Sequence, residues 1–371
     1  MTRTDFDVAI LGGGLAGLSL SILLAQQGLH VAVFEQKTYP FHRVCGEYVA
    51  MESWDFLQRL GLNLAKQRLP RITRLQVTTP TQSLESPLAP GGFGISRYQL
   101  DWQLAAAARE AGVQLYTGTR VQSITTSKTV HTSAGVFRAR LLCGAFGKHS
   151  NLDTQLRPEQ LPPQTGEPTF VGIKYHLNTR FPKDLIALHN FAGGYCGIST
   201  IEAERVCCCY LVSQETLTKA GGVAALEDQI LSQNPYLASI FAHATFCWDK
   251  PQAIAQVYFS PRRPLPGAFP LGDAAGLIPP LCGNGMSMAF RSADLLAPLV
   301  CGVLSGTQTE SEALQRYAHL WQNTFGQRMM TGRFLQKHFG HLWPINSLLN
   351  LLRPVPRLRA ALIARTHGAP F

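Results

Sequence analysis

The N-terminal segment alternates apolar runs and glycines in the order expected for a strand, a tight turn, a helix and a second strand. Residues 8–11 form a short apolar run, and Leu18 and Ile22 then recur at helical spacing up to Gly28, which suits a helix cap. The run HVAVFE at 30–35 predicts the second strand. This order predicts an α/β unit of the doubly wound, Rossmann-like kind.

The middle of the chain changes to short stretches that are typical of strands. The segments TFVGIKYHL, LIALHNF, YCGISTIE and VCCCYLV predict an antiparallel sheet, and a helix follows at 225–242. An earlier excursion at 73–94 points to the same sheet. Between them, helix 98–111, strand 113–116 and a β-meander at 121–142 return to the first unit. The two parts therefore interleave along the sequence.

The C-terminal segment combines apolar faces with arginines. Pro354 and Pro356 separate two short predicted helices, and proline cannot continue a helix. Their apolar faces consist of Leu348, Leu349, Leu351, Leu352, Leu358, Leu362 and Ile363. We expect a helix pair that caps the core; the functional alternative is a pair that docks on a membrane or a carrier protein.

Charge is unevenly distributed. The net charge is +10, and no Asp or Glu follows Glu312, whereas eight cations do: Arg316, Arg328, Arg333, Lys337, Arg353, Arg357, Arg359 and Arg365. No nucleic-acid-binding module accompanies them, so a membrane surface, an acidic carrier protein or a phosphorylated substrate suits this charge better. A solvated tail without a partner is the alternative.

Several protein classes are excluded by composition. The 9 cysteines show no CxxC spacing, which argues against disulfide-reductase chemistry, a zinc site and a disulfide framework. Asp5 and Asp7 rule out a signal peptide, and no uninterrupted apolar run reaches the roughly 18 residues of a membrane span. We expect a cytoplasmic protein with reduced, buried thiols, with peripheral contact to a membrane surface as an option.

The first glycine turn fits a dinucleotide. Gly12, Gly14 and Gly17 form GxGxxG between the first strand and its helix. Gly12 permits the sharp turn, Gly14 lets the backbone approach a pyrophosphate, and Gly17 lets the helix pack close to the strand. Glu35 ends the second strand, where a carboxylate accepts hydrogen bonds from ribose hydroxyls. This unit alone suits either NAD or FAD.

A second motif favours FAD. The stretch FPLGDAAGLIPPLCGNGMSMAFRSADLLA at 269–297 predicts a short strand that ends at Gly272 and Asp273, and a glycine turn at 283–285 that opens a helix. FAD needs one anchor for its ADP half and another for its ribityl and isoalloxazine half. An aspartate at a strand end binds ribityl hydroxyls, and a helix N-terminus stabilises negative charge at the reduced ring.

The paired motifs resemble those of p-hydroxybenzoate hydroxylase-type monooxygenases and geranylgeranyl reductase-like flavoproteins. The pattern GDAAHxxPPxxGxG fits 272–285, with Gly276 in place of its His, as in the reductase-like branch. The resemblance implies that Arg43 contacts the ADP side of FAD and that Arg97 matches the arginine that begins the helix after the first excursion. The cofactor-binding residues so implied are Gly12, Gly14, Leu15, Ala16, Gly17, Glu35, Gln36, Lys37, Arg43, Val44, Cys45, Gly46, Arg97, Val121, Gly147, Gly272, Asp273, Pro280, Gly283, Asn284, Gly285 and Met286.

A third motif of such hydroxylases, GADGxxSxxR, is altered. The stretch GAFGKHSNLD at 144–153 keeps Ser150, but Phe146 replaces the aspartate and Asp153 replaces the arginine. An aromatic ring cannot hydrogen-bond a nicotinamide nucleotide as a carboxylate can, so direct use of NAD(P)H is doubtful and a partner flavin reductase is an option. No WxWxIP or FxGxxxHxxxW stretch supports a tryptophan-type halogenase or a Baeyer–Villiger enzyme.

The loop FHRVCGEYV at 41–49 supplies the candidate catalytic residues. In the reductase-like branch a Cys-Gly pair also lies near the reactive face of the flavin, so Cys45 either lines the site, donates a proton or only packs. Glu47 either acts as an acid or base or holds the loop. In this superfamily an antiparallel sheet roofs the flavin, and the candidate substrate contacts on it are Tyr175, His189, Tyr195, Cys196 and Tyr210.

We therefore predict an α/β fold with a Rossmann-like FAD-binding domain of the glutathione reductase type, an interleaved antiparallel β-sheet substrate domain and C-terminal helices. The FAD-binding domain is assigned to 1–72, 95–165 and 262–305, the substrate domain to 73–94 and 166–261, and the helical region to 306–371. The leading function is monooxygenation of a bulky apolar aromatic, polyketide or lipid-like substrate. The alternative is C=C reduction or desaturation of a prenyl or polyene chain; a non-catalytic flavin-binding protein is the third option.

Overall fold

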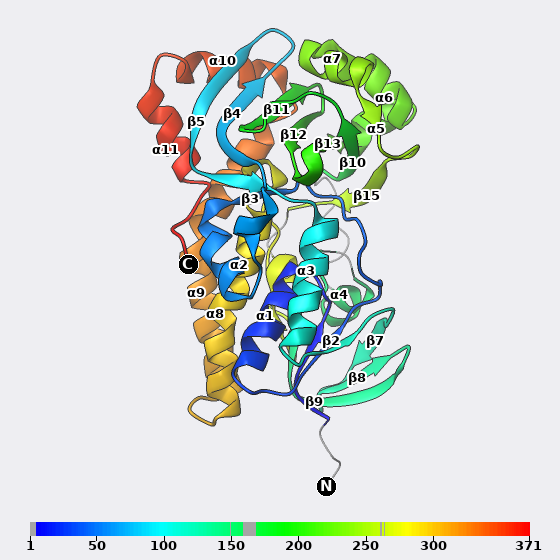
Figure 1. Ribbon diagram of the computed structural model, residues 1–371, viewed down its shortest axis with the longest axis vertical. Helices are drawn as coiled ribbons and strands as arrows, with labels where there is room; N and C mark the ends of the chain where they lie inside the picture. Colours follow the sequence, from blue (N-terminus) through cyan, green and yellow to red (C-terminus); the bar gives the residue numbers. More distant parts are fainter. Residues whose placement is uncertain (1–4, 149, 159–167, 260–261, 263) are drawn as a thin grey trace.

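The computed structural model describes residues 5–148, 150–158, 168–259, 262 and 264–371. Two sheets lie one above the other, and long helices run along one side of both (Figure 1). The α/β class with interleaved sheets and C-terminal helices is confirmed. The division into domains stays a prediction.

The lower sheet has 7 strands in the order β6-β2-β1-β9-β8-β7, with β16 paired to β9. Strand β1 is parallel to both β2 and β9, with Val8 opposite Val31 and Leu141. The full set is β1 (Phe6–Leu11), β2 (Val31–Phe34), β6 (Gln114–Tyr116), β7 (Val121–Ile124), β8 (Thr129–Thr132), β9 (Gly135–Gly144) and β16 (Phe269–Pro270). The central strand β1 is almost wholly buried, which explains its continuous apolar run.

The upper sheet has 9 strands in the order β14-β10-β13-β12-β11-β4-β5-β3, with β15 paired to β10. All its pairs are antiparallel except β11 with β4. Its strands are β3 (Tyr48–Ala50), β4 (Arg71–Thr78), β5 (Ser83–Gly94), β10 (Phe170–Asn178), β11 (Leu185–Phe191), β12 (Gly194–Thr200), β13 (Val206–Ser213), β14 (Thr245–Phe246) and β15 (Gln252–Val257). The excursion at 73–94 thus joins the later strands, as predicted.

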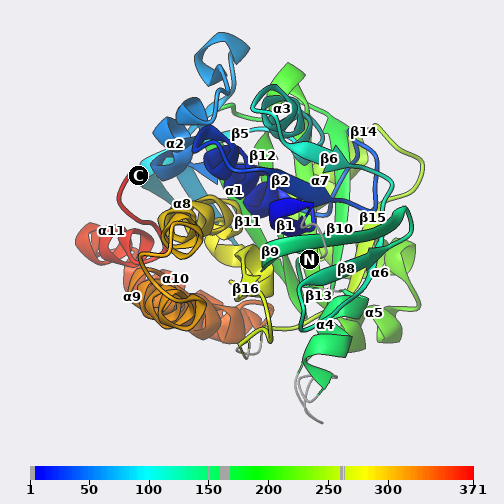
Figure 2. The ribbon, with the colours of Figure 1, turned by 90° about the horizontal axis from the view of Figure 1, so that it is seen from below.

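The helices cover the sheets on distinct faces. Helices α5, α6 and α7 pack on the outer face of the upper sheet through Leu217, Leu226 and Leu237, and α9 to α11 lie along one side next to α8 (Figures 1 and 2). The set is α1 (Leu15–Gln26), α2 (Trp54–Arg59), α3 (Arg97–Glu110), α4 (Asn151–Leu156), α5 (Gln214–Ala220), α6 (Val223–Gln229), α7 (Pro235–His243), α8 (Gly285–Leu304), α9 (Glu310–His338), α10 (Leu342–Leu352) and α11 (Pro356–Ala364).

Two predictions about helices need comment. The single helix expected at 225–242 is wrong: it is α6 and α7, because Asn234 caps a new helix whose first residue is Pro235. Helix α8 is long and apolar enough to cross a membrane by length and composition. Half of that apolar window is buried, and Phe290 and Leu296 belong to the core that α1 shares, so α8 is a core helix here.

Candidate flavin and substrate site

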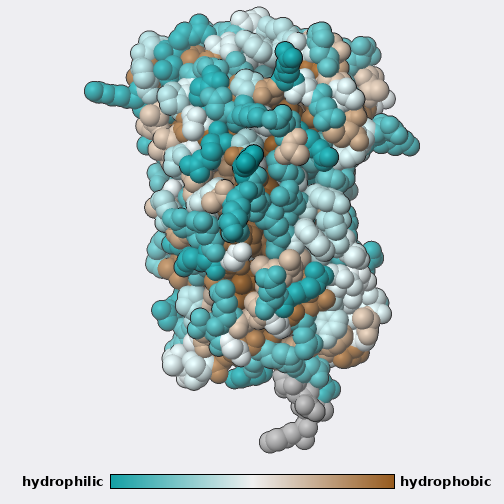
Figure 3. Space-filling view, viewed as in Figure 1, coloured by the Kyte–Doolittle hydropathy of each residue, from teal (hydrophilic) through white to brown (hydrophobic). Residues whose placement is uncertain are grey.

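One continuous cavity of about 1020 Å³ lies between the two sheets. Its lower part is lined by the glycine turns of the parallel sheet, and its upper part by the inner face of the upper sheet and by α9 to α11. The face of the molecule seen in Figure 1 is mostly hydrophilic (Figure 3). We call the lower part the flavin end and the upper part, between β4, β5, β11, β12 and α9 to α11, the substrate chamber.

The turn between β1 and α1 is built to hold a phosphate. Gly12 has a φ of +116°, and a Cβ there would lie 2.4 Å from the Ala145 carbonyl oxygen. A Cβ on Gly17 would lie 2.1 Å from the Gly12 carbonyl oxygen, so α1 packs against the turn as predicted. Nothing lies within 4 Å of a Cβ on Gly14, which caps α1 without a side chain. The free N–H groups of α1 therefore face the cavity.

Glu35 fixes the edge of this turn. Its carboxylate accepts hydrogen bonds from the backbone N–H of Gly13 (3.1 Å) and of Lys37 (2.9 Å), and it pairs with Arg43 (3.2 Å). Arg43 also reaches Asp101 and lies over the Phe41 ring. Arg43 thus lies beside the first glycine turn, and its contact with the ADP side of FAD stays a prediction.

The second anchor is the turn before α8. Asp273 lies on the short turn after β16 and lines the cavity. Burial raises the pKa of Asp273, and the cations Lys148, Arg97 and Arg262 oppose that rise. Gly283 has a φ of +66° and lies close to the Tyr48 ring, and α8 begins at Gly285. A carboxylate and a helix N-terminus thus lie beside the first turn of α1, since a Cβ on Gly272 would lie 3.0 Å from the Ala16 Cβ, and they offer FAD its second anchor.

Almost all predicted cofactor contacts line the cavity. The two that do not are Gly17, which packs α1 against the turn, and Asn284, whose side-chain amide donates to the Thr366 carbonyl oxygen. The lining members are Gly12, Gly14, Leu15, Ala16, Glu35, Gln36, Lys37, Arg43, Val44, Cys45, Gly46, Arg97, Val121, Gly147, Gly272, Asp273, Pro280, Gly283, Gly285 and Met286. Their roles toward FAD stay predictions, although both ends of the cradle fit it.

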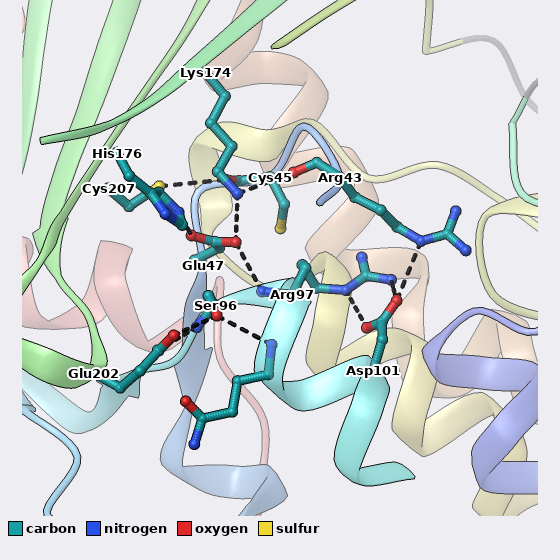
Figure 4. A network of polar contacts seen from close by, with 11 residues as sticks. Arg43, Cys45, Glu47, Ser96, Arg97, Asp101, Lys174, His176, Glu202 and Cys207 are labelled. Atoms are coloured by element: carbon teal, nitrogen blue, oxygen red, sulfur yellow. Dashed lines mark hydrogen bonds and ion pairs between the residues drawn. The ribbon is translucent and has the colours of Figure 1, made fainter. Parts of the chain in front are cut away.

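Glu47 is the centre of a buried ion cluster that anchors the 41–49 loop (Figure 4). Its carboxylate pairs with Lys174 and lies 2.6 Å from His176 Nε2; it also accepts the backbone N–H of Arg97 at 2.7 Å. All three side chains are buried, and Lys174 also donates to the Arg43 carbonyl oxygen. Burial alone raises the pKa of Glu47, but Lys174 and His176 outweigh it and lower the pKa to about 2. This favours the loop-holding role over acid or base catalysis.

Cys45 lies at the boundary between the two ends of the cavity. The residue is half-buried and lines the cavity, and its carbonyl oxygen accepts a hydrogen bond from the Cys207 thiol (3.4 Å). Arg97 is held by Asp101 through contacts of 2.6 and 2.8 Å, and both belong to α3. The hydrogen bond from Cys207 holds the backbone of Cys45 in place. This position suits either lining the cavity or donating a proton to the substrate.

Alternation along the strands decides which predicted substrate contacts face the chamber. Tyr210 borders the chamber, but its ring packs in the outer-face cluster opposite its strand partner Cys196, and its hydroxyl donates to Glu227 there (2.6 Å). Tyr195 lines the chamber. Tyr175, His189 and Cys196 do not line it. Tyr175 and Cys196 pack in the outer-face cluster under α6 and α7, and His189 bonds Thr78 (2.8 Å). These three predictions are corrected, because a one-residue shift along a strand reverses the face.

The sequence interpretation missed two sets of lining residues. One is Lys148, which follows the glycines of the third motif, lines the cavity and faces Asp273, Cys209 and Cys45; burial lowers the pKa of its ammonium. The other is the apolar side chains of α9 to α11. The helical spacing of the leucines was visible in the sequence, but the sequence did not indicate that they would pack against the upper sheet. They are Leu335, Phe339, Ile345, Leu348, Leu349, Leu352, Leu362 and Ile363.

Comparison with known proteins supports the assignment of the lower part. Residues 5–173 match the family model described as "FAD binding domain". The chain thus carries a FAD-binding domain of the kind found in FAD-dependent monooxygenases, and FAD is its cofactor. The predicted resemblance to FAD-dependent monooxygenases is therefore confirmed, and the roles of the individual site residues toward FAD stay predictions.

Individual relatives are distant. The chain is 24% identical over 361 residues to "Conditioned medium factor receptor 1" of Dictyostelium discoideum, covering 86% of this chain and 68% of that protein. It is 28% identical over 377 residues to "Phenazine 1,6-dicarboxylic acid hydroxylase PhzS" of Lysobacter antibioticus, covering 85% and 86%.

Two solved structures share the fold. One is the flavin-dependent brominase Bmp2, with a TM-score of 0.80, 19% identity and coverage of 99% of this chain and 94% of that one. The other is Pseudomonas aeruginosa PqsL in complex with 2-aminobenzoylacetate, with a TM-score of 0.73, 18% identity and coverage of 93% and 99%. At this identity the likeness concerns the fold alone.

Proposed function

We propose that this protein is a FAD-dependent monooxygenase that hydroxylates a bulky, apolar small molecule. The observation that carries the proposal is the single cavity that joins the flavin end to an aliphatic chamber. Bound FAD, once reduced, supplies the activation of oxygen. The chain positions the substrate between the upper sheet and α10, and its leucines exclude water from the reacting carbon. The hydroxylase activity in the name of the Lysobacter antibioticus relative is consistent with this chemistry.

The test is the fate of oxygen. FAD-loaded protein is reduced with dithionite under anaerobic conditions, mixed with an aromatic, polyketide or lipid-like candidate, and then exposed to air. A product that carries one oxygen atom from O₂ supports the proposal. A colourless, correctly folded protein without bound flavin would contradict both this proposal and the family assignment.

The alternative is C=C reduction or desaturation of a prenyl or polyene chain. It is favoured by the position of Cys45, a free, half-buried cysteine that lines the cavity. The same experiment separates the two reactions. A saturated product formed without oxygen, with no oxygenated product in air, would establish the reductase and exclude the monooxygenase.

The electron donor is proposed to be a partner flavin reductase. Phe146 lies where the superfamily motif has an aspartate; its ring packs in the apolar cluster with Val121 and Leu152 and lines the cavity. This position thus offers no carboxylate to a nicotinamide nucleotide. We expect NADPH alone to leave the flavin oxidised while dithionite bleaches it. Rapid bleaching by NADPH would overturn this part of the proposal.

A peripheral contact with an anionic lipid bilayer is also proposed for the C-terminal helices. Large apolar side chains there are exposed, notably Trp343 (80%), Leu351 (61%) and Phe334 (60%). No Asp or Glu follows Glu312, so this region attracts anionic lipid headgroups.

Sedimentation with vesicles tests this contact. We expect the protein to sediment with vesicles that contain phosphatidylglycerol, less with pure phosphatidylcholine, and less at high salt. Trp343→Ser should reduce binding, whereas Trp102→Ser, which removes an exposed tryptophan from α3, should not. Equal binding of both variants would contradict the assignment to the C-terminal helices, and no sedimentation of the unmodified protein would exclude the contact.

A further inference from the structure

The charges that line the cavity are distributed unequally. Most belong to the flavin end, including Glu35, Arg43 and Asp273. The strands of the upper sheet and helices α9 to α11 contribute, among the described lining residues, a single charged side chain, that of Arg359 on α11. The chamber around it is lined by aliphatic side chains such as Leu84, Leu348 and Leu362. The Arg359 guanidinium is therefore a charged group at the wall of an otherwise aliphatic chamber.

Arg359 is only partly satisfied by the protein. One of its terminal nitrogens donates to the Arg353 carbonyl oxygen (3.3 Å), while its Nε is buried and has no hydrogen-bond partner. No carboxylate of the described residues forms an ion pair with Arg359, and the chain carries no Asp or Glu after Glu312. A buried donor without an acceptor is costly, and a guanidinium stays charged at any physiological pH. An anion from outside the chain would supply an acceptor for this guanidinium.

The position of Arg359 on α11 sets the distance between this anion and the flavin end. After α11, the chain contacts the flavin-end turn: Asn284 donates to the Thr366 carbonyl oxygen, and His367 lies 3.4 Å from the Tyr48 hydroxyl. Arg359 lies seven residues earlier, which is about 10 Å along a helix. At that outer end Arg353 donates to the carbonyl oxygen of Ser83, the first residue of β5.

We propose that Arg359 is a specificity-determining residue that binds the anionic end of an amphiphilic substrate. The substrate is a molecule with a carboxylate or phosphate at one end and an apolar body that fills the chamber. Its other end reaches the flavin end near Cys45. This assignment rests on the proposed function, since it names the substrate class of the same cavity. A guanidinium binds carboxylates and phosphates through two parallel hydrogen bonds, so both chemistries suit it.

Equilibrium binding tests the assignment without turnover. FAD-loaded, oxidised protein is titrated calorimetrically with decanoate, decyl phosphate and decan-1-ol, each below its micelle-forming concentration. We expect at least one of the two anions to bind about 10- to 100-fold more tightly than the alcohol, as a charged hydrogen bond implies. The anion that shows the preference identifies the headgroup. Equal affinity for all three probes in the unmodified protein would overturn the proposal.

Variants locate the preference. Arg359→Met should abolish the advantage of the anion over the alcohol, and Arg359→Lys should retain part of it. Arg357→Met, which removes an exposed arginine from the same helix, should retain all of it. Loss of the preference in Arg357→Met as well as in Arg359→Met would overturn the assignment to Arg359. FAD content and the thermal midpoint are measured for each variant, and the comparison of probes on the unmodified protein decides the outcome even where a variant does not fold.

The outcome is separable from that of the monooxygenase proposal. Binding is measured with oxidised protein, without reductant and without consumption of oxygen. Anion-selective binding without oxygenated product would contradict the monooxygenase and support the Arg359 site. Hydroxylation of a neutral substrate, together with equal binding of the anions and the alcohol, would support the monooxygenase and contradict the Arg359 site.

Discussion

The flavin end and the substrate chamber of the cavity are built in different ways. At the flavin end, backbone N–H groups and missing side chains shape the site, and each turn is contiguous in sequence, as at 12–17 and 272–285. In the chamber, side chains from β4, β11, β12 and α10 meet only because the chain is folded. A site made of local backbone geometry is visible as a motif, whereas a site made of distant side chains is not.

The largest expected effect comes from separating these two regions. Glu47 belongs to the loop of the flavin end and Lys174 to the upper sheet, and their buried ion pair joins them. Glu47→Gln leaves the Lys174 ammonium buried without its carboxylate. Removing one partner of a buried pair costs about 3–5 kcal/mol of unfolding free energy, which chemical denaturation measures. A matched surface variant, Glu204→Gln, breaks the exposed pair with Lys183 and should change stability little.

The ion pair between Glu47 and Lys174 also predicts that the folded protein loses stability at acid pH. The pKa of Glu47 is about 2 in the folded protein against an ordinary value of 4.5. Because the folded pKa is lowered, the stabilisation is fully present above pH 4.5 and is lost as the pH falls from 4.5 toward 2. The stability difference between the unmodified protein and Glu47→Gln should therefore narrow across this window. A difference that stays constant would contradict the assigned charge state.

The second effect tests whether backbone geometry makes the flavin end. Gly17→Ala would place a Cβ 2.1 Å from the Gly12 carbonyl oxygen, so α1 must shift away from the turn. We expect a loss of about 1–3 kcal/mol in the stability of the FAD-free protein, together with weaker FAD binding. Gly14→Ala has nothing within 4 Å of its Cβ, so it should weaken FAD binding and leave the FAD-free stability unchanged. Equal effects of both variants on stability would contradict this division of roles.

The sequence predicted the flavin end well and the chamber poorly, for a physical reason. Gly12, Glu35 and Asp273 were recognisable because a phosphate or a ribityl chain imposes fixed spacing on neighbouring residues. The inner face of the upper sheet was not, because Tyr175 and Cys196 differ from facing residues only by one position along a strand. The C-terminal leucines were correctly placed on helices, but nothing in their spacing indicated that α10 would close the cavity over the sheet.

The third effect tests this assignment of faces. A Cβ on Gly197 would have its nearest neighbour, the Cys209 carbonyl oxygen, at 3.6 Å, so Gly197→Val fits the strand and fills part of the chamber. We expect KM for the substrate to rise by about 10-fold or more, with FAD content unchanged. The adjacent control Cys196→Ala alters the outer face, so it should lower the thermal midpoint and leave KM unchanged. A larger rise of KM in Cys196→Ala than in Gly197→Val would contradict the assignment of Gly197 to the chamber face and of Cys196 to the outer face.

The smallest expected effect concerns Cys45, where the two regions meet. If the protein hydroxylates its substrate, the thiol has no proton to supply to the reacting carbon, and Cys45→Ser should change turnover by less than about 10-fold. If the protein instead reduces a C=C bond with Cys45 as proton donor, the same variant should lower turnover by about 10²- to 10⁴-fold, because serine is the weaker acid. Turnover is compared at saturating substrate, with FAD absorbance and the stability of Cys45→Ser as controls. The Cys207 thiol on β13 donates to the Cys45 carbonyl oxygen, and Lys174 on β10 donates to the Arg43 carbonyl oxygen of the same loop. Because these contacts do not involve the Cys45 side chain, the substitution should leave the loop in place and report on chemistry alone.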